Sequence, residues 1–156
     1  RGWEDKIDVF SDLAKDINNV REELLHLVDE DSNAFNAIMN VFKFPKNNEK
    51  EKQIRKEAIN KATLYAAEVP LRVMRKAFEC YIYIRKLSKE GNQNSISDSG
   101  VACLCIYACI YGAYLNVRIN LKGIENDNGI MNEAKEILSK SEIEKEKILN
   151  FIQQKI

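Results

Sequence analysis

Proline, glycine and histidine are scarce in this sequence. The 156 residues include two prolines, six glycines and one histidine. Because proline and glycine are the residues that interrupt helices most strongly, their scarcity leaves room for long helices. The single histidine, His26, falls on a predicted helix and there is no nucleophile elbow, which excludes a Ser–His–Asp site. A Gly-rich phosphate loop is also missing. We interpret His26 as a structural or surface residue.

An excess of charge of either sign is missing as well. Lys and Arg together number 24, Asp and Glu together number 24, and the formal net charge is +0. No overall field therefore attracts nucleic acid or an anionic membrane, and we predict neither as a partner. Apolar residues make up 45% and charged residues 31%, an ordinary globular mixture. We predict one domain over residues 1–156.

The cysteines lack the spacing of a metal site. The four are Cys80, Cys103, Cys105 and Cys109, none in a C-x-x-C pair, and His26 lies far away in the sequence. We predict no metal, buried thiols and a cytoplasmic protein. The chain begins at Arg1 rather than Met, which indicates a fragment, a processed product or part of a longer protein.

Apolar residues recur every three or four positions, which predicts an all-α fold. The first stripe runs from Trp3 to Val28, and the polar run 29–32 leaves two alternatives: either the helix continues, or Asp31 caps a second one. Pro45 and the polar residues after it predict a loop. Glu49 begins the next helix.

Two further breaks are predicted in the middle of the chain. Pro70 predicts a kink in the helix that begins at Glu49, because proline lacks the backbone N–H and clashes with the preceding turn. The helix resumes from Leu71 to about Lys89, with Gly91 as its C-cap.

The most apolar segment is Val101–Leu115, fifteen residues without a charge. A membrane span needs about 20 residues, so we predict a buried helix, either the central one or part of a subunit interface. Ser97 or Asp98 is expected to cap it, and residues 117–119 are expected to be extended. With a last helix over about 129–154, the pattern predicts a single-domain bundle of five or six helices around a central apolar helix.

Polar residues bracket this apolar helix at both ends. They are Asn92, Asn94, Ser97 and Asp98 at its start, and Asn116, Arg118, Asn120 and Lys122 at its end. Buried amides and charges need partners, either within the protein or on a ligand. Capping and loop hydrogen bonds are the alternative to ligand binding. Tyr107, Tyr111 and Tyr114 share one helical face, which favours a core or interface stripe over a stacking surface.

Five segments resemble the motifs of a known family, in the right order. Residues 92–102 resemble N-x-N-[AS]-x-S-D-[AS]-G-V-A, and residues 112–121 resemble G-A-x-x-N-V-x-[IA]-N-L. Residues 27–36 are similar to L-x-D-x-D-x-x-A-[FY], residues 43–46 to K-x-P-[KR], and residues 67–71 to A-x-x-P-L. The family is the cyclodeaminase/cyclohydrolase group, which includes the C-terminal domain of formiminotransferase-cyclodeaminase and stand-alone methenyltetrahydrofolate cyclohydrolases.

This resemblance implies a helical homodimer that acts on a one-carbon-loaded tetrahydrofolate, with no permanently bound cofactor. Asp31 and Asp98 are implied for acid/base chemistry. Asn94, Ser97, Asn116 and Asn120 are implied for substrate binding, mainly at the pterin. Lys43, Arg118 or Lys122 would meet the glutamate carboxylates. We expect the cyclohydrolase, which hydrolyses 5,10-methenyltetrahydrofolate to 10-formyltetrahydrofolate, since no transferase domain is attached. The cyclodeaminase, which releases ammonia, is the alternative.

One family feature does not occur in these residues. The family pattern includes an N-terminal helix opened by a P-G-G-G-S-like segment, which is expected to help line the folate pocket. A protein without that segment would fit a third alternative, a non-catalytic helical interaction module.

Overall fold

The computed structural model describes residues 6–156, and this part of the chain forms four long helices and no strand. The helices are α1 (Ile7–Val41), α2 (Glu49–Glu90), α3 (Ile96–Asn120) and α4 (Ile130–Gln153), with a short 3-10 helix, η2 (Gln93–Ser95), before α3. The all-α prediction is confirmed. The prediction of five or six helices was wrong, and Trp3, where the first was expected to begin, lies outside the described residues.

The difference in number arises at the two weakest predicted breaks. The acidic run 29–32 lies inside α1, so Asp31 is a mid-helix residue rather than a cap. Pro70 lies inside α2, which is a single helix of 42 residues. The helix therefore accommodates a residue that ordinarily breaks one.

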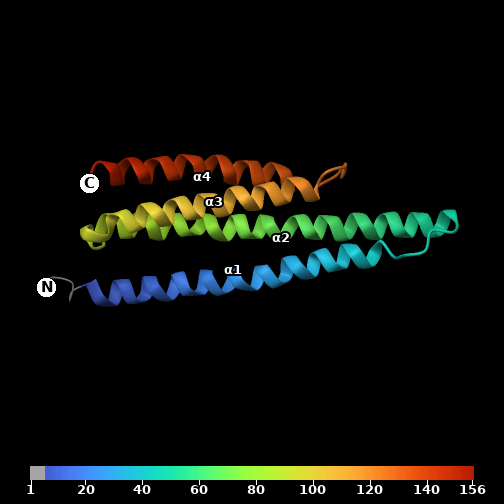
Figure 1. Cartoon of the computed structure of the whole chain (residues 1–156), viewed down its shortest axis with the longest axis horizontal. Helices are drawn as coiled ribbons and strands as arrows, with labels where there is room; N and C mark the ends of the chain where they lie inside the picture. Colours follow the sequence, from blue (N-terminus) through green and yellow to red (C-terminus); the bar gives the residue numbers. More distant parts are fainter. Residues whose placement is uncertain (1–5) are drawn as a thin grey trace.

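The helices form an elongated antiparallel bundle (Figure 1). α2 packs against α1, α3 and α4, and α3 packs against α4 as well. The central element of this chain is therefore α2. The prediction that the apolar helix α3 is the central one was wrong for the single chain, which leaves the subunit-interface alternative.

The core has two parts. The larger lies among α2, α3 and α4 and includes Leu71, Met74, Tyr81, Ile110 and Val117, all almost fully buried. The smaller lies between α1 and α2 and consists of Leu27, Ala34, Ala66 and Val69. α1 is thus held by a thinner apolar seam than α3 and α4.

α3 has two apolar faces, and only one of them is buried. The buried face includes Ile96, Cys103, Ile110, Ala113 and Val117. The other, which we call the open face, exposes large side chains at roughly half of their area, with small residues between them: Val101, Leu104, Cys105, Ala108, Tyr111, Gly112, Leu115 and Ile119. By length and composition, residues 93–120 would also suffice to cross a membrane, and 28% of their most apolar window is buried.

The helix ends follow local chemistry. The Asn48 side chain accepts a hydrogen bond from the Glu51 N–H at the start of α2, and the Gly91 N–H closes its end on the Leu87 carbonyl. Gly91 was predicted as this C-cap. α3 begins at Ile96, so the prediction of a cap at Ser97 or Asp98 was wrong, because both residues lie in its first turn.

The end of α3 also differs from its prediction. Residues 117–119 are helical rather than extended, and α3 continues to Asn120. The β-branched side chains of Val117 and Ile119 lower helix propensity only slightly, and burial of Val117 against the core outweighs that preference. Gly123, with a φ of +85°, ends the segment as expected.

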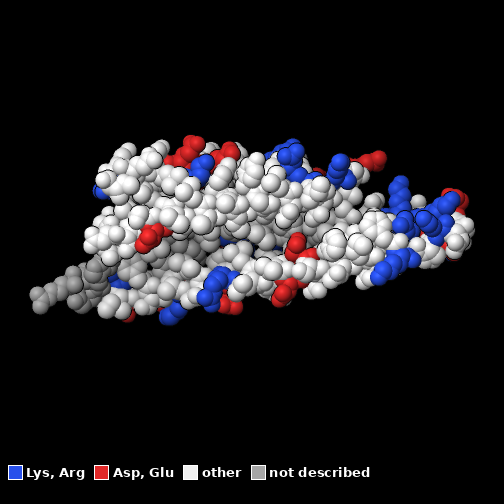
Figure 2. Space-filling model, viewed as in Figure 1, with Lys and Arg blue, Asp and Glu red and all other residues white. Residues whose placement is uncertain are grey.

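The connection between α1 and α2 forms a basic tip. In Figure 1 this tip extends beyond α3 and α4, and Figure 2 shows Lys and Arg side chains gathered there. Lys46, Lys52, Arg55 and Lys56 line a shallow pocket on it. The Arg55 guanidinium stacks on Phe42 and donates to its carbonyl, which fastens the start of α2 to the end of α1.

Candidate active site

An apolar groove with a few polar side chains lies between α1 and α3. Both helices pack on α2 side by side, so α2 forms the floor and the two helices form the walls. The groove holds a volume of about 510 Å³, within the range of small-molecule sites. Its lining residues are Leu24, Leu27, Val28, Asp31 and Ser32 from α1, Pro70 and Val73 from α2, and Ala108, Cys109, Gly112, Ala113 and Asn116 from α3.

Asp31 and Asn116 are the polar residues of this groove that the sequence motifs indicated. Asp31 reaches it from α1 and Asn116 from α3, although the two are far apart in sequence. The Asp31 carboxylate offers a proton acceptor to this apolar groove. The Asn116 carboxamide offers both a hydrogen-bond donor and an acceptor. The structure thus brings together two of the predicted site residues.

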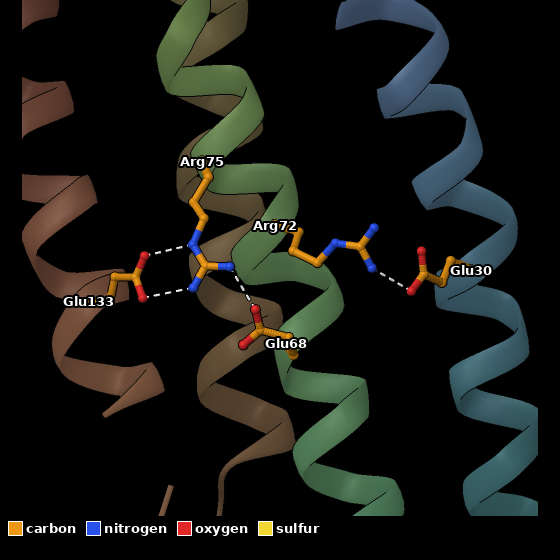
Figure 3. A network of polar contacts seen from close by, with 5 residues as sticks. All are labelled: Glu30, Glu68, Arg72, Arg75 and Glu133. Atoms are coloured by element: carbon orange, nitrogen blue, oxygen red, sulfur yellow. Dashed lines mark hydrogen bonds and ion pairs between the residues drawn. The ribbon is translucent and has the colours of Figure 1, made fainter. Parts of the chain in front are cut away.

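The residue before Asp31 fixes how this turn of α1 meets α2. The Glu30 carboxylate accepts hydrogen bonds from the Tyr65 hydroxyl at 2.7 Å and from the Arg72 guanidinium, both on α2 (Figure 3 shows the Arg72 contact). The Tyr65 hydrogen bond, followed by Arg72, lowers the pKa of Glu30 below its ordinary value. Since Glu30 is tied to α2, the next side chain, Asp31, is turned toward the groove.

A second ion-pair cluster joins α2 to α4. The Arg75 guanidinium donates from Nε and Nη2 to the two carboxylate oxygens of Glu133 at 2.6 and 2.7 Å, and from Nη1 to Glu68 at 2.6 Å (Figure 3). The hydrogen bonds from Arg75 lower the pKa of Glu133. All three donor nitrogens are therefore used within the protein, and we assign the cluster a structural role.

Asn120 makes a contact that the sequence did not reveal. Its Nδ2 donates to the carbonyl of Ala66 at 2.7 Å. The side chain was predicted to bind substrate, and the structure shows its amide nitrogen bonded to the backbone of α2.

The predicted residues at the start of α3 lie away from the groove. Asn94 belongs to η2, and Ser97 and Asp98 are exposed in the first turn of α3. At 1.5 Å per helical residue, Asp98 lies ~27 Å along α3 from Asn116. Within one chain, the two predicted acid/base carboxylates, Asp31 and Asp98, are therefore not brought together.

The predicted cationic residues also lie outside the groove lining. Lys43 is on the α1–α2 tip, where its Nζ donates to the Asn40 side chain at 3.2 Å. The Arg118 guanidinium lies 5.7 Å from the centre of the Tyr114 ring, and Lys122 is exposed just after α3 ends.

The thiols divide into two pairs. Cys103 is fully buried, which raises its pKa to about 11, and Cys80 is partly buried. Cys105 and Cys109 are exposed on α3, so the prediction that all four thiols are buried was wrong for these two. Cys109 lines the groove. Within residues 6–156 no group of three or more Cys, His, Asp or Glu side chains is placed to hold a metal.

Comparison with known proteins places the chain in a family. The sequence profile of the formiminotransferase-cyclodeaminase family matches residues 1–140. The chain belongs to that family. A methenyltetrahydrofolate cyclohydrolase from Methylorubrum extorquens is 35% identical over 123 residues, which cover 77% of this chain and 59% of that protein. The Gallus gallus formimidoyltransferase-cyclodeaminase is 31% identical over 127 residues, 81% of this chain and 24% of that protein.

A solved structure shares the fold over nearly the whole chain. The crystal structure of formiminotetrahydrofolate cyclodeaminase from Thermotoga maritima superimposes with a TM-score of 0.75 and 26% sequence identity, covering 99% of this chain and 73% of that one. The resemblance of the chain to this family, predicted from the five sequence motifs, is confirmed. The chain spans less than two thirds of the curated relatives named above.

Several residues around the groove were missed from the sequence. Glu30, Arg72 and Val73 lie beside motif positions, and Cys109 lies in the apolar run of α3. The clue for the first two was available: a glutamate on one predicted helix and an arginine on the next, each next to a family motif. Nothing local indicated that Pro70 and Val73 would form the floor of the groove.

Proposed function

We propose that the groove between α1 and α3 binds a tetrahydrofolate derivative and that the protein hydrolyses 5,10-methenyltetrahydrofolate to 10-formyltetrahydrofolate. The observation that carries this proposal is the position of Asp31, a carboxylate at an otherwise mostly apolar groove that Asn116 enters from the opposite wall. A flat, largely apolar ligand with one amide-like edge and a cationic carbon fits those groups. The Methylorubrum relative has the corresponding activity in its name.

The reaction requires little more from the protein than a carboxylate. The methenyl carbon that bridges N5 and N10 is part of a cationic amidinium group. Asp31 stabilises that positive charge and accepts a proton from the attacking water as the carbon–oxygen bond forms. It returns this proton to N5 as the bond between the carbon and N5 breaks, and the hydroxyl loses its proton to solvent, which leaves the N10-formyl product. Asn116 pairs with the amide-like edge of the pterin, which fixes the ring in the groove.

The open face of α3 supports a homodimer with a shared site. Its small residues, Ala108 and Gly112, lie near the middle of the helix and at the edge of the groove, so a second α3 that packs on them also covers that edge. A two-fold axis at that point makes the two α3 helices antiparallel, because the same patch serves both subunits. Such a dimer covers the exposed apolar side chains on both copies.

An antiparallel pair also reunites the two polar ends of α3. The start of one helix lies beside the end of the other, so Asp98 of the partner subunit lies near Asn116 and Asp31 of the first. Asn94 and Ser97 are carried to the same place, and Arg118 and Lys122 remain at the mouth for the glutamate carboxylates. Each site is then built from two chains.

The activity test is direct. The protein is mixed with 5,10-methenyltetrahydrofolate, and loss of the substrate's absorbance is compared with buffer. We expect acceleration by the wild type and a loss of about 10²- to 10⁴-fold for Asp31→Asn, the usual contribution of a general acid or base. The matched control is Asp29→Asn, an exposed carboxylate of the same helix that does not line the groove. No acceleration by the wild type would contradict the proposal.

Mixing two inactive variants tests the shared site. Asp31→Asn and Asp98→Asn subunits are combined under conditions that exchange subunits. In a shared site the mixed dimer has one doubly altered site and one intact site, so activity returns to about a quarter of the wild type at equal amounts. If each variant is inactive alone and the mixture is inactive too, the carboxylates do not act across subunits. If Asp98→Asn alone is fully active, Asp98 has no catalytic role.

The cyclodeaminase is a second candidate, supported by the names of the Thermotoga and Gallus relatives. There N10 attacks an N5-formimino carbon, and Asp31 in its protonated form delivers the proton that lets ammonia leave. Measuring ammonia released from 5-formiminotetrahydrofolate separates the two reactions. A protein with neither activity would instead fit the non-catalytic interaction module.

A further inference from the structure

A proline in the middle of a long helix leaves one carbonyl without its usual partner. In an α-helix the N–H of residue i bonds to the carbonyl of residue i−4, and proline has no N–H. Pro70 lies inside α2, so the carbonyl that loses its partner is that of Ala66. Ala66 is buried, with 4% of its surface exposed, and a buried carbonyl without a partner is costly.

Asn120 replaces the missing donor. Its Nδ2 donates to the Ala66 carbonyl at 2.7 Å, across 54 residues of sequence. Asn120 is the last residue of α3, so the bond joins the end of that helix to the middle of α2. The Asn120 side chain, which comes from α3, thus gives the Ala66 carbonyl of α2 the hydrogen bond that Pro70 cannot donate.

This bond sits beside the groove. Pro70 lines the floor of the groove, and Asn116, one helical turn before Asn120 and on the same side of α3, lines its wall. Apolar packing of Val117 holds α3 against the core. The buried face of α3 sets how the whole helix packs, and the directional hydrogen bond of Asn120 adds a constraint at its last turn, beside Asn116.

We infer that Asn120 is a positioning residue: its hydrogen bond to Ala66 holds the rotation of α3 at its C-terminal end and thereby keeps Asn116 turned into the groove. The inference rests on the proposed function insofar as Asn116 contacts the folate. In this role Asn120 acts on the ligand through Asn116.

A substitution at Pro70 allows two roles of Asn120 to be tested separately: positioning α3, and donating a hydrogen bond to the Ala66 carbonyl. Asn120→Ala alone leaves the Ala66 carbonyl without a donor, and we expect its equilibrium constant for unfolding to rise about tenfold. Pro70→Ala supplies the backbone N–H that α2 lacks. The double variant Asn120→Ala/Pro70→Ala therefore regains a bonded carbonyl without the link to α3, and its stability should return to that of Pro70→Ala.

The decisive measurement compares the double variant with Pro70→Ala, since Pro70 itself lines the groove. We expect the KM for 5,10-methenyltetrahydrofolate to be about tenfold higher in the double variant, the loss of one hydrogen bond to the ligand, although its urea midpoint matches. If both the urea midpoint and the KM match those of Pro70→Ala, Asn120 only satisfies a carbonyl and the inference is wrong.

A second readout does not depend on the folate proposal. Cys109 lines the groove from α3, so a rotation of that helix changes how its thiol is exposed. In a background with Cys105→Ser and Cys80→Ser, we expect maleimide to label Cys109 at a rate changed severalfold by the double variant relative to Pro70→Ala. An unchanged rate contradicts the inference, whether or not the protein acts on folate. A changed rate without any folate activity upholds the inference and removes the proposed function.

Discussion

α3 and α4 have 25 and 24 residues and both pack on α2, yet their outer faces are made of different residues. No charged side chain occurs in α3 between Asp98 and Arg118, and its open face exposes apolar side chains along its length. The outer face of α4 is rich in Glu and Lys, with Ile143 as an exposed large apolar residue. Contacts within the single chain explain how apolar and polar residues are distributed around α4. For α3 they explain only one of its two apolar faces.

The outer face of α4 has the composition of a solvated surface, and the open face of α3 does not. Single apolar residues scattered over a protein surface are ordinary. A continuous apolar face of this length marks an interaction surface. The dimer proposed above covers it.

The largest effect is expected from a charge on the open face. Leu104, 50% exposed in the single chain, is buried by the proposed dimer, and Leu104→Glu places a charge there from both subunits. We expect the dimer dissociation constant to rise about 100-fold or more, measured by sedimentation equilibrium. The control is Ile143→Glu on α4, with a similar 51% exposure, which should leave the constant unchanged. A wild type that is monomeric, or that binds lipid vesicles through this face, contradicts the prediction.

On its inner side α4 is held by a buried hydrogen bond. The Tyr81 hydroxyl and the Ser141 hydroxyl lie 2.8 Å apart, and both residues are buried. Tyr81→Phe leaves Ser141 without this partner, and we expect a loss of about 1–3 kcal/mol in the free energy of unfolding. Adding Ser141→Ala should recover part of that loss, measured by urea unfolding. A double variant whose loss equals the sum of the losses of Tyr81→Phe and Ser141→Ala would show that the pair is not coupled.

The same tyrosine predicts a response to high pH. Burial raises the pKa of Tyr81 to about 12, from an ordinary value of 10.0. Above pH 10 the unfolded chain loses this proton and the folded protein keeps it, so stability falls as the pH rises from 10 toward 12. Urea midpoints across this interval should fall less steeply for Tyr81→Phe than for the wild type.

The smallest effect is expected at the edge of α4 that faces α2. Glu133→Gln removes the bidentate ion pair with Arg75, whose side chains are 43% and 38% exposed. Because solvent screens such a pair, we expect a loss of only about 0.5–1 kcal/mol, reduced further by added salt. The control is Glu136→Gln, which breaks the outward pair with Lys140 and should change almost nothing.

The fold was predictable from the sequence wherever a signal was local. Pro45, Gly91 and Gly123 each mark a true boundary, because backbone restrictions of single residues decide those positions. The polar run 29–32 was ambiguous because acidic residues are tolerated on the exposed side of a helix. The helix continues through Pro70, and the Ala66 carbonyl that the proline leaves without a backbone donor is bonded to Asn120, which lies far from it in the sequence. An apolar helix likewise does not reveal whether its own chain or a second one covers it.

The candidate site was predictable only in part, for a geometric reason. Family motifs indicated Asp31 and Asn116, and the structure places both on one groove. The same motifs indicated Asp98, which lies at the other end of α3. A motif that extends along a helix identifies candidate residues. It does not show which end of that helix lies beside a particular neighbouring helix. The residues that hold the site in place, Glu30 and Asn120, bond across long sequence separations that pattern reasoning does not resolve.

The hydrogen bond between Asn120 and the Ala66 carbonyl has a consequence for how this sequence can diverge. Proline at position 70 is costly without a donor at position 120, and that donor loses much of its value once position 70 has an N–H. Loss of the donor before loss of the proline therefore passes through a less stable intermediate, whereas the reverse order does not. We therefore expect these two positions to covary among homologues, with asparagine at the second retained mainly where the first is proline.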